Sequence, residues 1–426
     1  MNSFEVNPPR LSWALLCRRP SSGNAQVKAR VEEILADVRQ QGDAALRRIS
    51  QEIDGRPLKE IAVSPAAIRE AAQAVSPAVK AAVADAAKNI RAFHEAQQPK
   101  EIRVETAPGV TCIQRPVPIG KIGLYIPGGS APLFSTVLML AIPARIALCP
   151  EVVLCTPAGK DGKVSPEVLY TADYCGIRKI FVLGGAQAIA AMAYGTETVP
   201  KVDKIFGPGN QYVTTAKQLL SAGTVAIDMP AGPSEVMVMA DASTPAAFAA
   251  ADLLSQAEHG PDSQVMLVAD TRETAQAILD EVERQTALLP RCGIAQKALE
   301  KSRAFVFSKL EDRIDFANAY APEHLIIATE NPWAIADKIT AAGSVFVGLY
   351  TPESAGDYAS GTNHTLPTSA WARSMSGVNL DSFYRKMTLQ EITREGLKGL
   401  RGTIVEMASA EGLDAHANAV KVRTDE

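Results

Sequence analysis

Short apolar segments, each followed by a turn that contains glycine or proline, recur along this 426-residue chain and constrain its fold more than any other feature. Stretches with helical spacing separate them, and such a βα alternation is typical of a parallel sheet with helices on both faces. The predicted strands of a first group are 121–126, 152–155, 179–183, 204–206 and 225–227. Those of a second group are 236–240, 264–269, 304–307, 325–328 and 344–347. Two successive groups predict two related α/β domains, with ligands at the carboxyl ends of the strands.

The segments outside these two groups are predicted to be mainly helical. Two Ser-Pro pairs, at 64–65 and 76–77, each combine an N-cap with a first-turn proline, so each begins a helix. His94 ends the second of these helices and is interpreted as structural or solvated. A hairpin is expected over 102–115, and beyond about residue 380 the pattern is helical and polar.

Composition and charge exclude several classes of partner. Hydrophobic residues make up 47% of the chain and charged residues 21%, which is ordinary for a globular protein. A net charge of -4 gives no reason to expect nucleic acid or an anionic membrane surface as partner. The longest apolar run, 137–148, is interrupted by Pro143 and Arg145, so no membrane span is expected. The six cysteines form no CxxC pair and lie mostly in apolar runs, which favours free thiols in the cytoplasm.

The few histidines gather in polar segments of the second half. Four of the five lie beyond residue 250. Gln256 and His259 are three residues apart at the end of an apolar helix and share one helical face. A carbonyl oxygen and an imidazole nitrogen on one face would supply half of a tetrahedral zinc site, although this segment alone is better explained by hydrogen-bonded structure. An aspartate and a second histidine would complete a mixed nitrogen and oxygen site, leaving a Glu-His pair for proton transfer.

Three polar segments are candidates for site loops. Glu323-His324 places an acid and a base next to each other at the entry of a strand, where they reach one cavity only if the backbone twists. The segment 354–368 is long, polar and rich in glycine. The loop 227–235 contains enough proline and glycine to have a fixed shape, which either positions a site or only turns the chain.

The chain contains no intact GxGxxG sequence. The nearest segment is 207–212, where Tyr212 occupies the place of the third glycine, so the dinucleotide-binding fingerprint is weak. Glycines after several strands would let backbone amides approach phosphate groups. Turn geometry alone is an equally simple explanation for them.

Several motifs together resemble those of the histidinol dehydrogenases. They are IDMPAGPSE (227–235), LLSQAEHGPDSQ (253–264), YAPEHL (320–325), SAGDYASGTNHTLPT (354–368), EGLDAHA (411–417), GLYIPGGSAPL (123–133), LGGAQAIAA (183–191) and FGPGNQYV (206–213). The similarity extends over nearly the whole chain from about residue 20, with order and spacing preserved. The resemblance implies NAD-dependent, zinc-requiring oxidation of L-histidinol to L-histidine through L-histidinaldehyde.

The resemblance also implies a role for particular residues. The zinc ligands would be Gln256, His259, Asp357 and His416, and the catalytic pair would be Glu323 and His324. Substrate would be bound by Ser234, Gln256, His259, Glu323, His324, Asp357, Glu411 and His416. NAD would be contacted by Tyr125, Gln187 and Asn210. His364 is not a ligand in the family pattern and is interpreted as loop structure.

The expected fold is α/β, with two related, incomplete Rossmann-like parallel-sheet domains and small N- and C-terminal helical arms. Residues 1–21 would form the N-terminal arm, and 22–124 with 235–379 a first domain that holds the metal and catalytic residues. Residues 125–234 would form a second domain for NAD. Residues 380–426 would form a C-terminal arm that is exchanged in a homodimer, so that active sites are shared.

Other functions remain open at this point. A relative that acts on a different alcohol would keep the same fold and motifs. A zinc hydrolase would use Glu323 to activate a metal-bound water and would turn over without nucleotide. A non-catalytic binding protein would have no need for an acid-base pair beside a metal site.

Overall fold

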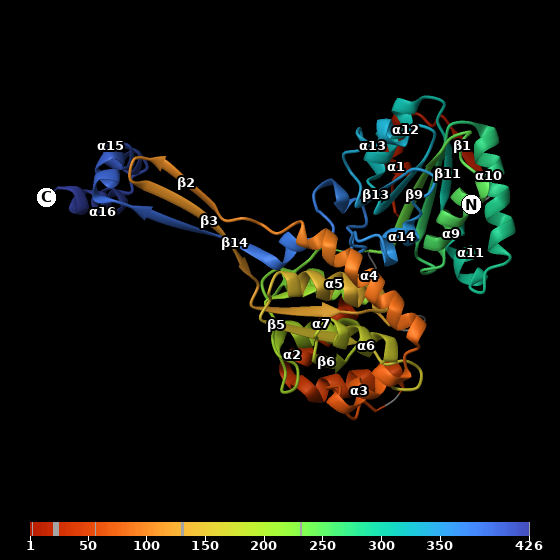
Figure 1. Cartoon of the computed structure of the whole chain (residues 1–426), viewed down its shortest axis with the longest axis horizontal. Coiled ribbons are helices and arrows are strands. Elements are labelled where there is room, and N and C mark those ends of the chain that lie inside the picture. Colours follow the sequence, from red (N-terminus) through yellow and green to blue (C-terminus); the bar gives the residue numbers. More distant parts are fainter. Residues whose placement is uncertain (2, 20–24, 56, 129–131, 231, 426) are drawn as a thin grey trace.

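The computed structural model describes residues 1, 3–19, 25–55, 57–128, 132–230 and 232–425. Two parallel sheets form the body, and a smaller antiparallel sheet projects from it (Figure 1). The predicted α/β class with two parallel sheets is therefore confirmed. All ten predicted strands are present, with bounds within about two residues of those expected.

The first parallel sheet has the strand order β1-β11-β10-β9-β12-β13. Its strands are β1 (Phe4–Val6), β9 (Glu235–Ala240), β10 (Gln264–Ala269), β11 (Arg303–Val306), β12 (His324–Ala328) and β13 (Ser344–Val347). Its helices are α1 (Trp13–Leu16), α9 (Ala246–Ala257), α10 (Arg272–Thr286), α11 (Cys292–Glu300), α12 (Leu310–Tyr320), α13 (Pro332–Ala336) and α14 (Glu353–Tyr358). Alternate residues of β9 face opposite sides, so Val236 and Val238 pack with α9, α10 and α11 while Met237 and Met239 pack with α1 and α12.

The second parallel sheet has the order β6-β5-β4-β7-β8. Its strands are β4 (Lys121–Tyr125), β5 (Glu151–Thr156), β6 (Lys179–Val182), β7 (Lys204–Phe206) and β8 (Ala226–Ile227). Its helices are α2 (Ala25–Asp54), α3 (Pro65–Ala74), α4 (Pro77–Glu95), α5 (Phe134–Ile146), α6 (Pro166–Tyr174), α7 (Gly185–Tyr194) and α8 (Gln211–Ser221). One core lies between the sheet and α3 to α6, and the other between the sheet and α2, α7 and α8.

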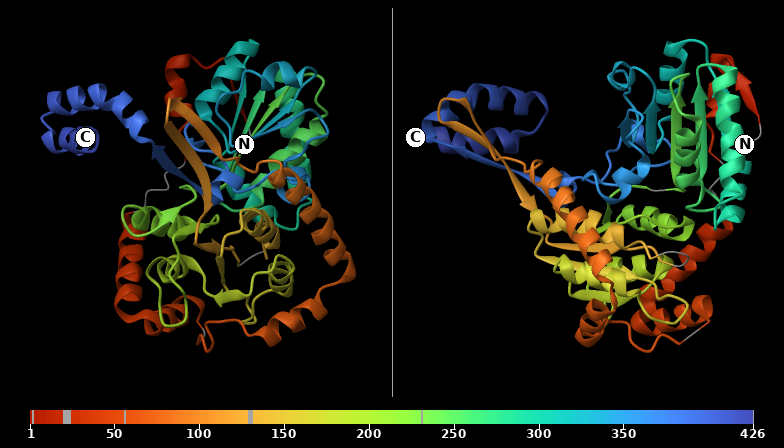
Figure 2. Two further views of the ribbon diagram at one scale, coloured as in Figure 1. Left: turned by 60° about the vertical axis from the view of Figure 1, so that its left-hand side comes forward. Right: turned by 45° about the vertical axis from the view of Figure 1, so that its right-hand side comes forward.

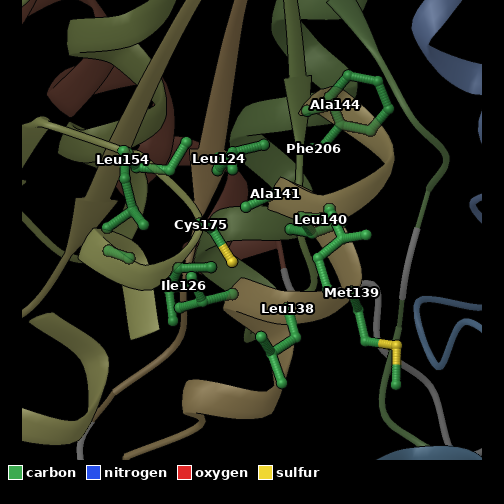
Figure 3. Packing of buried hydrophobic residues seen from close by; sticks show 14 of the residues in the cluster. Leu124, Ile126, Leu138, Met139, Leu140, Ala141, Ala144, Leu154, Cys175 and Phe206 are labelled. Atoms are coloured by element: carbon green, nitrogen blue, oxygen red, sulfur yellow. The ribbon is translucent and has the colours of Figure 1, made fainter. Parts of the chain in front are cut away.

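Helix α5 explains the apolar run at 137–148. All of its residues from Ser135 to Ala144 are buried, and Leu138, Leu140 and Ala141 lie among strand residues such as Leu124 (Figure 3). A helix that is apolar on every side belongs inside a protein core. Among the described residues, no helix is both long and apolar enough to cross a membrane.

The packing of the N-terminal half differs from the expected domain division. Helices α2, α3 and α4, expected with the first sheet, bury their apolar faces against the second one. Strand β1 lies in the segment expected as an N-terminal helical arm, but it pairs with β11 of the first sheet. The strands at 121–126 and 235–240 were predicted correctly. The apolar face of an amphipathic helix shows that the helix is packed against something, but it does not show which sheet the helix covers.

The antiparallel sheet consists of β2 (Ile102–Ala107), β3 (Val110–Pro118) and β14 (Tyr384–Ile392). The hairpin expected over 102–115 is confirmed. Strand β14 was not predicted, because its residues are mostly exposed and show no apolar alternation. Beyond it, α15 (Arg394–Ala410) and α16 (Asp414–Thr424) pack against each other at the far end of the sheet, well away from the body in all views (Figure 2).

His94 is buried at the end of α4 and has a structural role. Its Nδ1 atom lies 2.8 Å from the carbonyl oxygen of Ile90, and its Nε2 atom lies 3.4 Å from Asn363 Nδ2. Asn363 Nδ2 also donates to the Met139 carbonyl at 2.6 Å, so this contact ties the 354–368 loop to α4 and α5.

Burial lowers the pKa of His94, which predicts acid sensitivity at this position. A base whose pKa is lower in the folded state binds its proton mainly after unfolding, so its contribution to stability is present above its unfolded pKa and is lost as the pH falls. Relative to His94→Gln, the wild-type chain should lose stability from about pH 7 to about pH 5, by at most about 1.4 kcal/mol per pH unit. Urea unfolding across that range measures this difference, and a constant difference would contradict the prediction.

Candidate active site

The predicted acid-base pair lies where two neighbouring strands begin. His324 is the first residue of β12, Glu323 precedes it, and β12 pairs with β9 in parallel. Both side chains are buried, and Glu323 Oε2 lies 3.6 Å from His324 Nδ1. The two adjacent side chains therefore lie close together at the entry of the strand, although adjacent residues of a regular strand point to opposite faces.

Both members of the pair bond to the backbone of Glu235, at the start of β9. The Glu235 amide donates to Glu323 Oε2 at 2.8 Å, and the Glu235 carbonyl oxygen lies 3.0 Å from His324 Nδ1. A carbonyl only accepts, so Nδ1 carries the proton and Nε2 keeps its lone pair. Nε2 points toward Asp357, with 3.9 Å between it and Oδ1.

Asp357 and Glu353 bring two carboxylates to the same place. They are four residues apart in α14 and therefore share a helical face. Glu353 is buried, with Oε1 3.7 Å from His324 Nδ1. Ligand atoms of His324, Glu353 and Asp357 all lie within 4.8 Å of one another.

Gln256 lies in the last turn of α9 and His259 just after it, and α9 contacts α14, which carries Glu353 and Asp357. Gln256 is fully buried, and in the described part of the chain neither polar atom of its side chain has a hydrogen-bond partner. His259 lies close enough to Asp357 for the two charges to interact. Loss of water around the ring lowers the pKa of His259 and outweighs the Asp357 carboxylate, which raises it.

The site shifts the pKa values of its acid and base in opposite directions. Burial lowers the pKa of His324 to about 4, against the Asp357 charge and the Glu235 carbonyl, which raise it. Burial also raises the pKa of Glu323 well above its usual range, and nearby carboxylates add to this shift. Opposed shifts of two neighbouring groups are typical of catalytic sites.

His364 connects this site with the second sheet. Its Nδ1 atom lies 2.9 Å from the Asp357 carbonyl oxygen, and its Nε2 atom lies 3.2 Å from Thr136 Oγ1 on α5. The 354–368 segment therefore lies between the two parallel-sheet units and holds Asp357 in place, which agrees with the interpretation of His364 as loop structure.

The location of the pair at the amino ends of β9 and β12 corrects an expectation. Ligand sites of parallel sheets usually lie at the carboxyl ends of the strands. The helix that connects two parallel strands runs antiparallel to them, so it ends beside their amino ends. Gln256 and His259, at the end of α9 and in the loop after it, are therefore on this side of the sheet.

Comparisons with known proteins identify the family to which this chain is similar. The family model described as histidinol dehydrogenase matches residues 17–424. A histidinol dehydrogenase of Bacteroides thetaiotaomicron is 54% identical over 416 residues, covering 98% of this chain and 97% of its own. One of Xanthomonas campestris pv. campestris is 53% identical over 399 residues, 93% of each chain. A crystal structure of histidinol dehydrogenase from Elizabethkingia anophelis matches with a TM-score of 0.96 at 50% identity, covering 99% of this chain and 98% of its own.

This chain belongs to the histidinol dehydrogenase family. It is therefore an oxidoreductase, and the resemblance found in its motifs is confirmed.

The residues expected to contact NAD in this family lie at the second sheet. Tyr125 ends β4, Gln187 lies in the first turn of α7, and Asn210 precedes α8. Tyr125 is buried, and its hydroxyl oxygen accepts from the Gly185 amide at 3.1 Å. Asn210 caps α8, with its side-chain oxygen 3.0 Å from the Tyr212 amide nitrogen. All three lie at or just beyond the carboxyl ends of strands, where parallel sheets usually bind ligands.

A cavity of about 180 Å³ opens at the same edge of the second sheet. Its lining includes Gly128, Pro157, Lys163 and Ser165. A side chain at Gly128 would meet Pro157 at 2.6 Å, so the close approach of the turns after β4 and β5 requires glycine there.

The remaining expected substrate ligands are not all in one place. The Ser234 carbonyl oxygen accepts from the Gln264 amide at 3.1 Å, at the amino ends of β9 and β10. Glu411, which follows α15, and His416, in α16, are exposed, and these two helices lie away from the two parallel sheets within one chain (Figure 1). Glu353 was missed in the sequence, although its place four residues before Asp357 on a short helix was a usable signal.

Proposed function

We propose that this protein oxidises L-histidinol to L-histidine through L-histidinaldehyde, with zinc bound and two NAD reduced per substrate. The observation that carries the proposal is the buried Glu323-His324 pair, with Asp357 3.9 Å from His324 and His259 close to Asp357. The similar proteins are named histidinol dehydrogenases, and their similarity extends over nearly the whole chain.

The residues present fit a zinc ion. A buried amide without partners costs free energy, so the two polar atoms of Gln256 favour a ligand at this position. Gln256, His259 and Asp357 offer the mixed nitrogen and oxygen donors that zinc accepts. Zinc bound there would hold the imidazole and amine of the substrate and so orient the reacting carbon.

The protein's own groups can account for each proton transfer. His324 Nε2 takes the alcohol proton as hydride leaves for the first NAD, since Nδ1 is bonded to the Glu235 carbonyl. Glu323 then takes a proton from the water that attacks the aldehyde, while the protonated His324 returns its proton to the aldehyde oxygen and becomes a free base again. Glu323 Oε2 is bonded to the Glu235 amide, which leaves Oε1 for this step. His324 serves again as the base when the hydrate loses its second hydride.

We further propose that NAD binds along the carboxyl edge of the second sheet, in contact with Tyr125, Gln187 and Asn210. Gln187 is buried at the start of α7, where helix amides favour phosphate. The side-chain oxygen of Asn210 is used by its helix cap, so its amide group is the part left for a ligand. The His364–Thr136 contact joins the two sheets, which supports hydride transfer between a cofactor on one unit and a substrate on the other.

A homodimer with exchanged C-terminal arms is part of the proposal. The projecting sheet and its two helices carry exposed apolar side chains, among them Ile102, Val104, Met407 and Leu413. A partner subunit would cover such a surface and receive Glu411 and His416 in its own site. We propose the cytoplasm as the compartment, which the free thiols support.

The test is a stoichiometry. Purified, zinc-loaded protein is given limiting L-histidinol with excess NAD, and NADH and histidine are counted. We expect two NADH and one histidine per histidinol, with loss of activity on chelation and recovery with zinc. One NADH with accumulating aldehyde would contradict the hydration step. No NADH would redirect the proposal to another alcohol, and substrate turnover without nucleotide would favour a hydrolase.

A further inference from the structure

The backbone of Glu235 is the common support of the acid-base pair. It bonds to Glu323 through its amide and to His324 through its carbonyl oxygen, at 2.8 and 3.0 Å. A rotation or shift of this one residue would therefore move both catalytic side chains together.

The Glu235 side chain is in turn held by Arg19, from the N-terminal segment. Arg19 Nε donates to Oε1 at 2.9 Å and Nη2 donates to Oε2 at 2.8 Å, a bidentate pair. The Ser369 amide also donates to Oε1, at 2.9 Å. The side chains of Glu235 and Arg19 are only 2% and 15% exposed, so solvent weakens this pair little.

The same guanidinium also reaches the segment that leads into β12. Its Nη2 atom donates to the Ala321 carbonyl at 3.3 Å, and its plane covers the Tyr320 ring at 3.7 Å. Ala321 has a positive φ of 52°, a conformation unfavourable for alanine, two residues before Glu323. Arg19 thus binds to residues at the amino ends of both β9 and β12, where the Glu323-His324 pair lies.

Stability alone does not account for this arrangement. The attraction within a buried ion pair offsets little more than the free energy that desolvation of the two charges costs. Well-packed apolar residues can often replace such a pair without loss of stability. The bidentate contact of Arg19 with Glu235, here called the fork, contributes a fixed geometry. The planar guanidinium sets the direction of both Glu235 carboxylate oxygens and of the Ala321 carbonyl at once.

We propose that Arg19 is a positioning residue for the Glu323-His324 pair and acts through Glu235. Its fork keeps the Glu235 carbonyl on His324 Nδ1, so that the imidazole presents Nε2 to the alcohol. The catalytic part of this inference rests on the proposed function, whereas the effect on the imidazole tautomer does not.

The test compares Arg19→Lys with Arg10→Lys. Lysine keeps the charge at position 19 but cannot form the fork. Arg10 lies in the same N-terminal segment and pairs with Asp312 and Asp315 at an exposed site, so it controls for loss of an arginine there. Arg19→Lys should lower kcat by roughly 10- to 100-fold with KM within about threefold, and Arg10→Lys should change neither beyond about twofold.

A second measurement does not depend on turnover. In protein labelled with ¹⁵N-histidine, His324 should show one fixed Nδ1–H tautomer, which Arg19→Lys should convert to a mixture. His324→Gln assigns the signal among the five histidines. If histidinol is not oxidised by the wild type, the proposed function fails, and the tautomer comparison still decides the role of Arg19.

Three results would overturn the inference. They are an unchanged kcat in Arg19→Lys, an unchanged His324 tautomer, or a loss of activity that matches the loss of folded protein. If Arg19→Lys does not fold, Glu235→Gln takes its place, since it keeps the shape of the side chain and is judged by the same two measurements.

Discussion

His324→Gln should lower kcat by about 10²- to 10⁴-fold, the range that a positioned general base contributes. Glutamine fills a similar volume but cannot accept the alcohol proton, so both hydride transfers should slow. KM for histidinol should change little, because the donors Gln256, His259 and Asp357 remain. Steady-state kinetics with NADH detection measure this effect, and a loss confined to KM would mean that His324 binds substrate rather than moving a proton.

Glu323→Gln should separate the two halves of the reaction. The hydration step assigned to Glu323 should slow more than the first oxidation, so histidinaldehyde should accumulate and NADH per substrate should fall toward one. Equal losses in both halves would count against the assignment. Glu330→Gln is a suitable control, because Glu330 is exposed just beyond the carboxyl end of the same strand, β12.

The second large effect concerns the C-terminal arm. His416→Ala alone should abolish zinc-dependent activity, since the fourth ligand would be lost in both sites of a dimer. Mixing it with inactive His324→Ala by refolding should restore activity if His416 serves the partner. One site of each mixed dimer then combines an intact body with an intact arm, so about a quarter of wild-type activity should return.

The same mixture decides between exchange and a folded-back arm. If His416 served its own chain, every site would carry one of the two substitutions and no activity would return. Zinc content provides a readout apart from turnover, because His416→Ala should lose metal while His324→Ala should keep it. Mixing His324→Ala with Glu323→Gln is the control, since both lie in the body and no site regains the pair.

Particular residues show how far sequence reasoning reached. The strand 236–240 and the hairpin 102–115 were found because buried strands and tight turns have local patterns. Gln256, His259 and Asp357 were grouped through their motifs; in the structure Asp357 lies 3.9 Å from His324 and His259 is near Asp357, while the metal role of all three stays a prediction. Strand β14 was missed because both of its faces are largely solvent-exposed in one chain, which removes the alternation that marks a strand.

By itself, the sequence determined the α/β class, the order of the strands along the chain and the family, because these depend on local hydrophobic periodicity and on motifs of contiguous residues. Only the tertiary structure decided which sheet the first helices cover, that the acid-base pair lies at the amino ends of β9 and β12, and that Arg19 supports it through Glu235. These contacts join residues far apart in the chain: Glu235 and His324 are 89 positions apart, and Arg19 and Glu235 are 216 apart. No local pattern specifies such a pairing, since it exists only after the strands have been brought side by side.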